Sequence, residues 1–183
     1  MAEGIILAGG KSTRMNTNKM LLEYNGRPII SYAIEGMKPF VDHLIVVTGR
    51  YDKEIRETLK EEKDIEIVTN ENYELGMFSS VITGVKHVRG PFFLIPGDCP
   101  FVQKETYDAL LNGHGDIRVP RYKDKDGHPI YIDEKYIDEL LSLPLDDNLK
   151  RFRDSKNYEI IDVRDKNIVM NLNNVLDFIK IND

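Results

Sequence analysis

A glycine pair followed by cations is the first feature of the sequence that could do chemistry. Gly9 and Gly10 precede Lys11, Arg14 and Lys19, and no acidic residue occurs from residue 9 to residue 22. Glycines let backbone N–H groups approach a phosphate closely, and Lys and Arg add charge-assisted hydrogen bonds. The stretch predicts a loop that binds nucleotide phosphates. The alternative is a tight turn beside a solvated basic surface.

The spacing of the glycines excludes two common nucleotide-binding motifs. A P-loop that ended at Gly10-Lys11-Ser12 would need a glycine at position 5, where the chain has Ile5. The dinucleotide fingerprint G-x-G-x-x-G fails as well, because Gly9 and Gly10 are adjacent and no third glycine follows. What remains is a glycine pair with a basic, hydroxyl-containing loop.

An aspartate stands in the sequence Pro-Gly-Asp-Cys-Pro, directly after the apolar residues 91–95. A carboxylate at the end of a buried strand, facing a phosphate-binding loop, suits Mg²⁺, which prefers carboxylate and phosphate oxygens. Asp98 is therefore the predicted metal ligand. The alternative is a capping or turn residue before a helix that starts near Lys104.

The elements that would position these residues alternate between strand and helix. Short apolar runs that end in turn residues predict strands at residues 4–8, 43–48, 65–69 and 91–95. Helical spacing predicts helices at residues 29–37, 53–62 and 77–88. This alternation predicts an α/β fold, a Rossmann-like three-layer sandwich with a mostly parallel sheet, in which ligands bind beyond the carboxyl ends of the strands.

The second half of the chain is less regular. Residues 117–120 and 129–132 are predicted to form a hairpin around a charged turn, and further strands are expected at 158–163 and 168–171. Helices are predicted at residues 135–141, 148–153 and 174–179. We interpret residues 1–183 as a single domain, with residues 1–110 as the NTP-binding half and residues 111–183 as the acceptor-binding half.

Composition limits the partners and the location. The 25 Lys and Arg against 31 Asp and Glu give a net charge of −6, which argues against nucleic-acid or acidic-membrane binding. The single Cys99 excludes an internal disulfide framework, and neither a signal-peptide core nor a membrane-spanning run is recognisable. We expect a cytoplasmic protein.

Five motifs in this order resemble the MobA-like nucleotidyltransferase family, which includes the molybdenum cofactor guanylyltransferases and cytidylyltransferases. They are LAGGKSTRM at 7–15, NKMLL at 18–22, GMFSSVITGV at 76–85, PGDCPFV at 96–102 and GHPIY at 127–131. The resemblance implies that a nucleoside monophosphate is transferred from an NTP to a phosphorylated acceptor, with Mg²⁺ bound and pyrophosphate released.

The resemblance also implies roles for individual residues. The nucleotide-binding set comprises Leu7, Ala8, Gly9, Gly10, Lys11, Ser12, Arg14, Lys19, Gly76, Ser79 and Ser80. The backbone of the first three would contact the base, whereas Lys19 would hold the α-phosphate. The cations Lys11, Arg14 and Lys19, with Asp98, form the expected catalytic set.

Asp98 and Asn173 are the implied metal ligands, and His128 is the implied contact to the acceptor. For Ser79 and Ser80 the alternative is that one of them caps the helix they open, and for His128 it is a structural place in the hairpin. The remaining histidines His43, His87 and His114 lack ligand spacing, and Cys99 lacks a paired histidine.

Three features favour the cytidylyltransferase branch, with CTP as the nucleotide and a molybdopterin-like acceptor. They are Asn18-Lys19, the Gly-Met-Phe-Ser-Ser stretch from Gly76, and Gly127-His128-Pro129. Two features depart from the family pattern: Asn16 stands where a glycine is usual, and the closing N-x-N-T-P-E-D element is reduced to NLNNVLD from residue 171. The second departure leaves the metal geometry open.

Three alternatives follow from these departures and from the variable second half of the chain. They are a guanylyltransferase, a transferase that uses a sugar or alcohol phosphate, and a non-catalytic module that binds a nucleotide and delivers a cofactor to a molybdoenzyme. Pyrophosphate release would separate the enzymes from the last of these.

Overall fold

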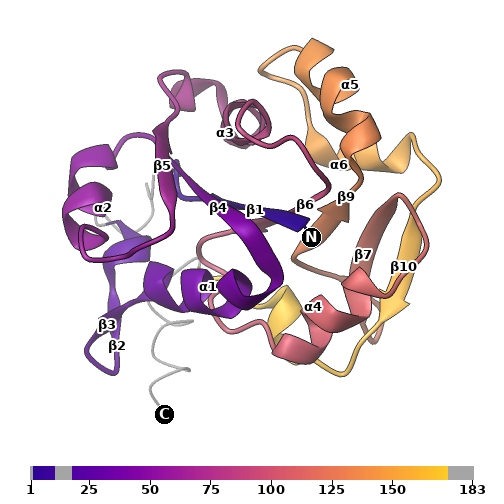
Figure 1. Ribbon diagram of the computed structural model, residues 1–183, viewed down its shortest axis with the longest axis horizontal. Coiled ribbons are helices and arrows are strands. Elements are labelled where there is room, and N and C mark those ends of the chain that lie inside the picture. Colours follow the sequence, from indigo (N-terminus) through magenta and orange to yellow (C-terminus); the bar gives the residue numbers. More distant parts are fainter. Residues whose placement is uncertain (1, 11–17, 173–183) are drawn as a thin grey trace.

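A mixed sheet of eight strands forms the centre of the protein, and helices cover both of its faces (Figure 1). The computed structural model describes residues 2–10 and 18–172. The strands of the sheet are β1 (Ala2–Leu7), β4 (Val41–Thr48), β5 (Glu66–Thr69), β6 (Phe92–Pro96), β7 (Ile117–Tyr122), β8 (Lys125–Asp126), β9 (Ile130–Ile132) and β10 (Glu159–Asp162). They lie in the order β10-β7-β9-β6-β1-β4-β5, and β8 pairs with β7.

The first-half strands are parallel, and the second half adds antiparallel pairs. Strand β1 runs parallel to both β4 and β6, so that Ile5 stands opposite Ile45 on one side and Leu94 on the other. Strand β9 runs antiparallel to β6 and β7, whereas β10 is parallel to β7. The predicted α/β class and mostly parallel sheet are confirmed.

Alternation along the central strands sends successive side chains to opposite faces of the sheet. In β1, Ile6 packs beneath α1 (Ile29–Met37), α2 (Asp52–Thr58) and α4 (Lys104–Leu111), whereas Ile5 and Leu7 pack against the other face. That second face is covered by α3 (Met77–Val85), α5 (Ile137–Ser142) and α6 (Leu149–Asp154). Apolar residues at consecutive strand positions are therefore all buried, which explains the continuous runs seen in the sequence.

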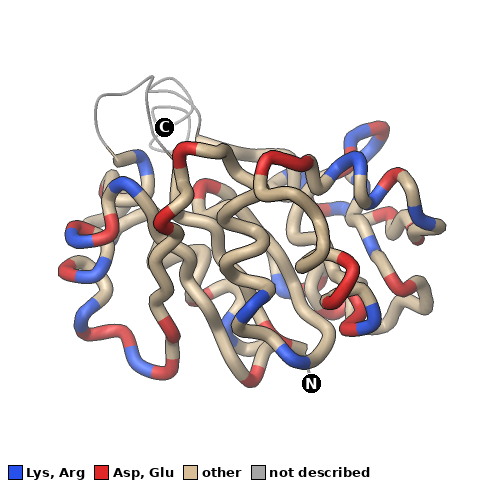
Figure 2. The backbone as a smooth tube through the Cα atoms, turned by 90° about the horizontal axis from the view of Figure 1, so that it is seen from above, with Lys and Arg blue, Asp and Glu red and all other residues tan. Residues whose placement is uncertain are grey.

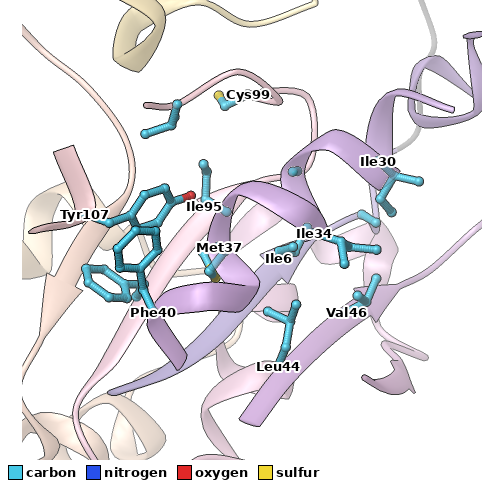
Figure 3. Close-up of a cluster of buried hydrophobic side chains, with 14 of the residues drawn as sticks. Ile6, Ile30, Ile34, Met37, Phe40, Leu44, Val46, Ile95, Cys99 and Tyr107 are labelled. Atoms are coloured by element: carbon cyan, nitrogen blue, oxygen red, sulfur yellow. The ribbon is translucent and has the colours of Figure 1, made fainter. Parts of the chain in front are cut away.

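The core on the α1 side is rich in branched aliphatic and aromatic side chains (Figure 3). Met37 of α1 lies among strand residues such as Ile95, and Tyr107 of α4 fills the space beside it. The Tyr107 ring stacks on Phe40 with centroids 4.9 Å apart and meets Phe93 edge-on at 5.4 Å. This aromatic packing fixes α4 and therefore the loop between β6 and α4.

The strand order places a topological switch point beside β1. From β1 the chain moves through α1 to β4 and through α2 to β5, and it then returns through α3 to β6 on the other side of β1. Because right-handed crossovers to opposite sides put the helices on opposite faces, the loops after β1 and β6 diverge and leave a crevice between them. This crevice is where the glycine pair and Asp98 emerge.

The short elements were missed or misread in the sequence. The structure has 3-10 helices η1 (Lys19–Leu21), η2 (Lys38–Phe40), η3 (Tyr73–Leu75), η4 (Glu134–Tyr136) and η5 (Lys166–Val169), and a small hairpin of β2 (Glu23–Tyr24) and β3 (Arg27–Pro28). The strand predicted at residues 168–171 is wrong, because η5 covers its first half and Met170 N donates to Asn167 O in a turn. The helix predicted at residues 174–179 lies outside the described residues.

Within residues 2–10 and 18–172, no helix combines the length and the apolar character that a membrane span requires. Positive and negative residues are interspersed along the outer helices and loops, while the central strands are largely uncharged (Figure 2).

Candidate functional site

A cavity of about 500 Å³ opens at the edge of the sheet where β1, β5 and β6 end. Eight residues that the sequence singled out line it: Leu7, Gly9, Gly10, Lys19, Gly76, Ser80, Asp98 and His128. Ala8 and Ser79 are buried behind the wall instead. Lys11, Ser12, Arg14 and Asn173 lie outside the described residues.

Lys19 and Asp98, which both line the cavity, form an ion pair. The Asp98 residue is 5% exposed, and the Lys19 side chain is 17% exposed, so both charges are largely shielded from solvent. Lys19 begins η1, which the Asn18 side chain caps by accepting from Met20 N at 3.1 Å. Asp98 follows Gly97, whose N–H donates to Leu7 O at 2.9 Å and so ties the loop after β6 to the end of β1.

The glycine turn after β1 is packed against the start of α3. A Cβ atom on Gly9 would lie 2.7 Å from Ser80 Oγ and 3.3 Å from Thr48 O, which is too close for any larger residue without displacement. Ala8 N donates to Val47 O at 2.7 Å and holds the preceding backbone against β4. Only a glycine at position 9 allows the turn to lie this near to Ser80. Gly9 and Gly10 both line the cavity.

A buried asparagine organises the two serines of α3. Asn70, after β5, donates from Nδ2 to Ser79 Oγ at 2.8 Å and to Ser80 Oγ at 2.9 Å. Ser79 Oγ also lies 2.7 Å from Gly76 O and 2.9 Å from Asn72 O, so its hydroxyl donates within the protein. Ser80 lines the cavity, whereas Ser79 is fully buried. We therefore expect Ser79 to hold Ser80 and Asn70 in position and not to contact a nucleotide itself.

His128 stands on the far side of Asp98, just before β9. Its ring lines the cavity and is half-buried, its Nδ1 is buried, and among the described residues this nitrogen has no hydrogen-bond partner. Burial lowers the pKa of His128 to about 4; the charge of Asp98 opposes this shift, and Arg153 adds to it. The imidazole is therefore neutral at physiological pH and can act as a hydrogen-bond donor or acceptor.

The backbone from Asp165 to Leu172 links His128 to Asp98. The buried Asp165 carboxylate accepts from Gln103 N at 2.7 Å and from Thr106 Oγ1 at 3.0 Å, which anchors this segment to the start of α4. Farther along, Ile168 O accepts from His128 N at 2.9 Å, and Leu172 N donates to Asp98 O at 3.1 Å. We name residues 165–172 the linking segment.

The linking segment also brings Asn171 to the cavity, close in sequence to the predicted ligand Asn173. Within the described residues, no cluster of three or more His, Cys, Asp or Glu side chains could hold a metal ion by itself. Asp98 is thus the carboxylate that lines the cavity beside Lys19, and Asn171 lines the same cavity.

Cys99 also borders the cavity but is buried, with 2% of its surface exposed. Burial raises the pKa of its thiol far above the usual range, the neighbouring Asp98 charge raises it further, and Lys19 lowers it. A thiol held protonated in this way is a poor nucleophile.

Four lining residues were not found from the sequence. Tyr73, Glu74 and Met77 come from η3 and the start of α3, and Met20 comes from η1. Tyr73 and Glu74 lie on a 3-10 turn that is too short to show a helical or strand period. Met20 and Met77 stand inside the NKMLL and GMFSSVITGV motifs but were given no role of their own. Gly76, whose φ is +108°, requires a residue tolerant of that region.

Comparison with known proteins identifies the family to which the chain belongs. Residues 4–160 match the MobA-like NTP transferase domain. The molybdenum cofactor cytidylyltransferase of Escherichia coli is 25% identical over 177 residues, which cover 96% of this chain and 92% of that protein. A probable molybdenum cofactor guanylyltransferase of Natranaerobius thermophilus is 29% identical over 111 residues, which cover 59% of this chain and 52% of that protein.

Solved structures share the fold over nearly the whole chain. The crystal structure of Rv0371c from Mycobacterium tuberculosis superposes with a TM-score of 0.88 at 23% identity and covers 98% of this chain and 96% of that one. The same protein has been determined in complex with manganese, with a TM-score of 0.83 at 21% identity over 98% of this chain and 97% of that one. From the match over residues 4–160, the chain belongs to the MobA-like NTP transferase family of nucleotidyltransferases.

Proposed function

We propose that the protein transfers CMP from CTP to a phosphorylated acceptor of the molybdopterin type and releases pyrophosphate, with Mg²⁺ bound. The observation that carries this proposal is the Lys19–Asp98 pair at the switch point of the sheet, beside the Gly9 turn. This arrangement puts a cation for phosphate oxygens and a carboxylate for a metal side by side. A separate protein nucleophile is not needed.

The residues present fit a divalent metal. Mg²⁺ at nucleotide sites is commonly bound by one or two carboxylates together with substrate phosphates, and Asp98 with Asn171 offers such a small oxygen set. Asn173 remains a proposed ligand. The structure of the mycobacterial protein in complex with manganese supports the proposal of a divalent cation. When bound, the metal would neutralise phosphate charge.

In the proposed reaction an oxygen of the acceptor phosphate attacks the α-phosphorus of the nucleotide. A new P–O bond forms, the bond from the α-phosphorus to the oxygen bridging to the β-phosphate breaks, and pyrophosphate leaves with that electron pair. Lys19 would leave Asp98 and bind the α-phosphate, stabilising the charge that develops there. Lys11, Ser12 and Arg14 are proposed to hold the β- and γ-phosphates.

The side of the cavity with His128 is proposed to receive the acceptor. The neutral ring lines the wall beyond Asp98 and can donate a hydrogen bond to a phosphate or a heterocycle. The choice of CTP rests on the Asn18-Lys19 and Gly127-His128-Pro129 motifs, and it agrees with the name of the Escherichia coli relative. A guanylyltransferase is the second candidate, because relatives with that name are also similar. A cytoplasmic location and delivery to a molybdoenzyme stay predictions.

Thermal-shift measurement with CTP, GTP, ATP and UTP in the presence of Mg²⁺ tests the nucleotide. A ligand at a hundredfold excess over Kd adds about 2.7 kcal/mol of stability, and CTP is expected to give the largest shift. Pyrophosphate release with CTP and molybdopterin then tests the transfer, with Asp98→Asn as the inactive control. A protein that no nucleotide stabilises would refute the proposal.

A further inference from the structure

The orientation of the Asn70 side-chain amide is fixed by the backbone around it. Asn70 directly follows β5, and its Oδ1 accepts from Asn72 N at 2.9 Å. Because a backbone N–H only donates, this bond identifies the atom that faces Asn72 as the amide oxygen. Asn70 N also donates to Thr48 O at 3.0 Å, which holds the residue against the end of β4. The amide nitrogen of this buried side chain therefore faces α3.

Both hydrogens of this amide nitrogen are taken by serines at the start of α3. Asn70 Nδ2 lies 2.8 Å from Ser79 Oγ and 2.9 Å from Ser80 Oγ. An amide nitrogen only donates, so each serine oxygen accepts from Asn70 and must give its own hydrogen to another group. For Ser79 that group is Gly76 O at 2.7 Å or Asn72 O at 2.9 Å. The Ser79 hydroxyl is therefore satisfied within the protein.

The hydroxyl hydrogen of Ser80 has no comparable acceptor. Among residues 2–10 and 18–172 no group accepts from this hydroxyl, although the residue is only 4% exposed. Ser80 lines the cavity, and a Cβ atom on Gly9 would lie 2.7 Å from its Oγ, so the hydroxyl lies beside the glycine turn. A shielded donor that lacks an acceptor costs free energy, so a ligand atom that accepts this hydrogen bond is favoured here.

Resting on the proposed function, we infer that Asn70 is a positioning residue that holds the Ser80 hydroxyl as a hydrogen-bond donor to the bound nucleotide. The accepting atom is an oxygen or a ring nitrogen of the nucleotide that carries no hydrogen and lies against the Gly9 turn. Asn70 itself does not line the cavity, so it acts through Ser80. A purely structural Asn70 would instead hold α3 against β5 with no effect that depends on the Ser80 hydroxyl.

Asn70→Asp tests this role with little change in shape. An ionised carboxylate only accepts hydrogen bonds, so at pH 8 the Ser80 hydrogen should turn toward the new carboxylate and away from the cavity. CTP and GTP, each with Mg²⁺, are titrated by calorimetry into the wild type, Asn70→Asp, Ser80→Ala and the double variant. Each single substitution should weaken binding about tenfold, whereas adding Asn70→Asp to Ser80→Ala should weaken it by less than about twofold.

Ser79→Ala provides the matched control, because Ser79 shares the Asn70 amide but does not line the cavity. Adding Asn70→Asp to Ser79→Ala should still weaken nucleotide binding about tenfold. Asn70→Ala is the second test variant, since it removes the amide donor without adding a charge. Its Ser80 hydroxyl is free to rotate, so binding should weaken about threefold, and again only where Ser80 is present.

Titration of CMP and of pyrophosphate then locates the accepting atom, and a loss of affinity for either ligand in Asn70→Asp supports the inference. Equal losses with and without the Ser80 hydroxyl would show that Asn70 acts through charge or packing, and would overturn it. Unchanged affinity in both Asn70→Asp and Asn70→Ala would do the same. In these two cases the wild type still binds nucleotide and the proposed function stands, whereas a wild type that binds neither CTP nor GTP would overturn both.

Discussion

The ammonium group of Lys19 is paired with the carboxylate of Asp98, although one is expected to serve the α-phosphate and the other a metal. Each group thus satisfies the other's charge before any substrate arrives. Removing one partner of a shielded pair leaves the other charge uncompensated, which destabilises the folded protein. The ion pair therefore keeps both charged side chains in the site. In the proposed reaction the pair must separate, because Lys19 would bind the α-phosphate and Asp98 a metal, and the first two predictions follow from this separation.

Replacement of Lys19 by alanine should slow turnover by about 10²- to 10³-fold, the magnitude seen when one preorganised donor to a developing negative charge is lost. The assay is pyrophosphate release at saturating CTP and acceptor. Lys53→Ala, an exposed lysine in α2, is the control and should retain wild-type turnover. Normal turnover of Lys19→Ala would remove Lys19 from the mechanism.

Lys19 and a divalent cation compete for Asp98, so metal binding should depend on nucleotide binding. Without nucleotide, Lys19→Gln is expected to bind Mn²⁺ about tenfold or more tightly than the wild type, within the usual range of coupling between sites. The measurement is the signal of free Mn²⁺ in electron paramagnetic resonance, with Asp98→Asn as the variant that loses binding. Equal Mn²⁺ affinity in the wild type and Lys19→Gln would show that the pair does not compete with the metal.

The lowered pKa of His128 predicts a pH-dependent stability. The folded protein holds the His128 proton only below a pH of about 4, whereas the unfolded chain takes it up near 6.5, so the unfolded state binds more protons between these values. Stability is therefore complete above pH 6.5 and falls as the pH drops through this window, by at most about 3 kcal/mol.

Urea unfolding of the wild type and His128→Asn at pH 7.5 and pH 4.5 isolates this contribution. Carboxylates with lowered pKa values, such as Glu3 and Asp52, also destabilise the protein at low pH, but they are common to both proteins. The variant should lose less free energy of unfolding than the wild type. Parallel losses would contradict the assignment.

The two serines of α3 should separate stability from ligand binding. Ser79→Ala leaves Asn70 and two backbone carbonyls short of a partner in the interior, so it is expected to cost about 1–3 kcal/mol of stability. Ser80→Ala, at the cavity wall, should mainly weaken nucleotide affinity. Chemical denaturation and nucleotide titration of both variants test this division, and the reverse pattern would refute it.

Cys99 should be dispensable for transfer. Because burial and Asp98 keep its thiol protonated, alkylation of the native protein should be slow and should accelerate on unfolding. Cys99→Ala is expected to keep turnover within about threefold of the wild type, since the thiol serves as a small apolar side chain. Loss of turnover in a folded Cys99→Ala protein would show a chemical role.

Sequence alone predicted the central strands and the crevice because their signals are local. The apolar run before Gly9 and the run before Asp98 each have strand length and end in turn residues, and the rules for α/β sheets bring their carboxyl ends together. The structure places Gly9, Lys19, Asp98 and His128 at one cavity, as those rules require.

The rest of the site depends on tertiary contacts that leave no pattern. Tyr73 and Glu74, which line the cavity, lie on a single 3-10 turn that is too short for periodicity, and Met77 follows at the start of α3. The run Ile168-Val169-Met170 has strand composition, yet Asp165 caps a 3-10 turn there by accepting from Asn167 N at 2.9 Å. Local capping prevailed over β propensity, which composition cannot reveal.

The linking segment has a consequence for the order in which the protein is assembled. Among the described residues, every strand of the sheet lies before residue 163, so these strands can pair before the rest of the chain is added. The bonds from Ile168 to His128 and from Leu172 to Asp98 form only when the last described residues have been added. During synthesis the sheet can therefore form before the contacts that hold His128 and Asp98 in place, and a chain cut short after β10 would lack these contacts.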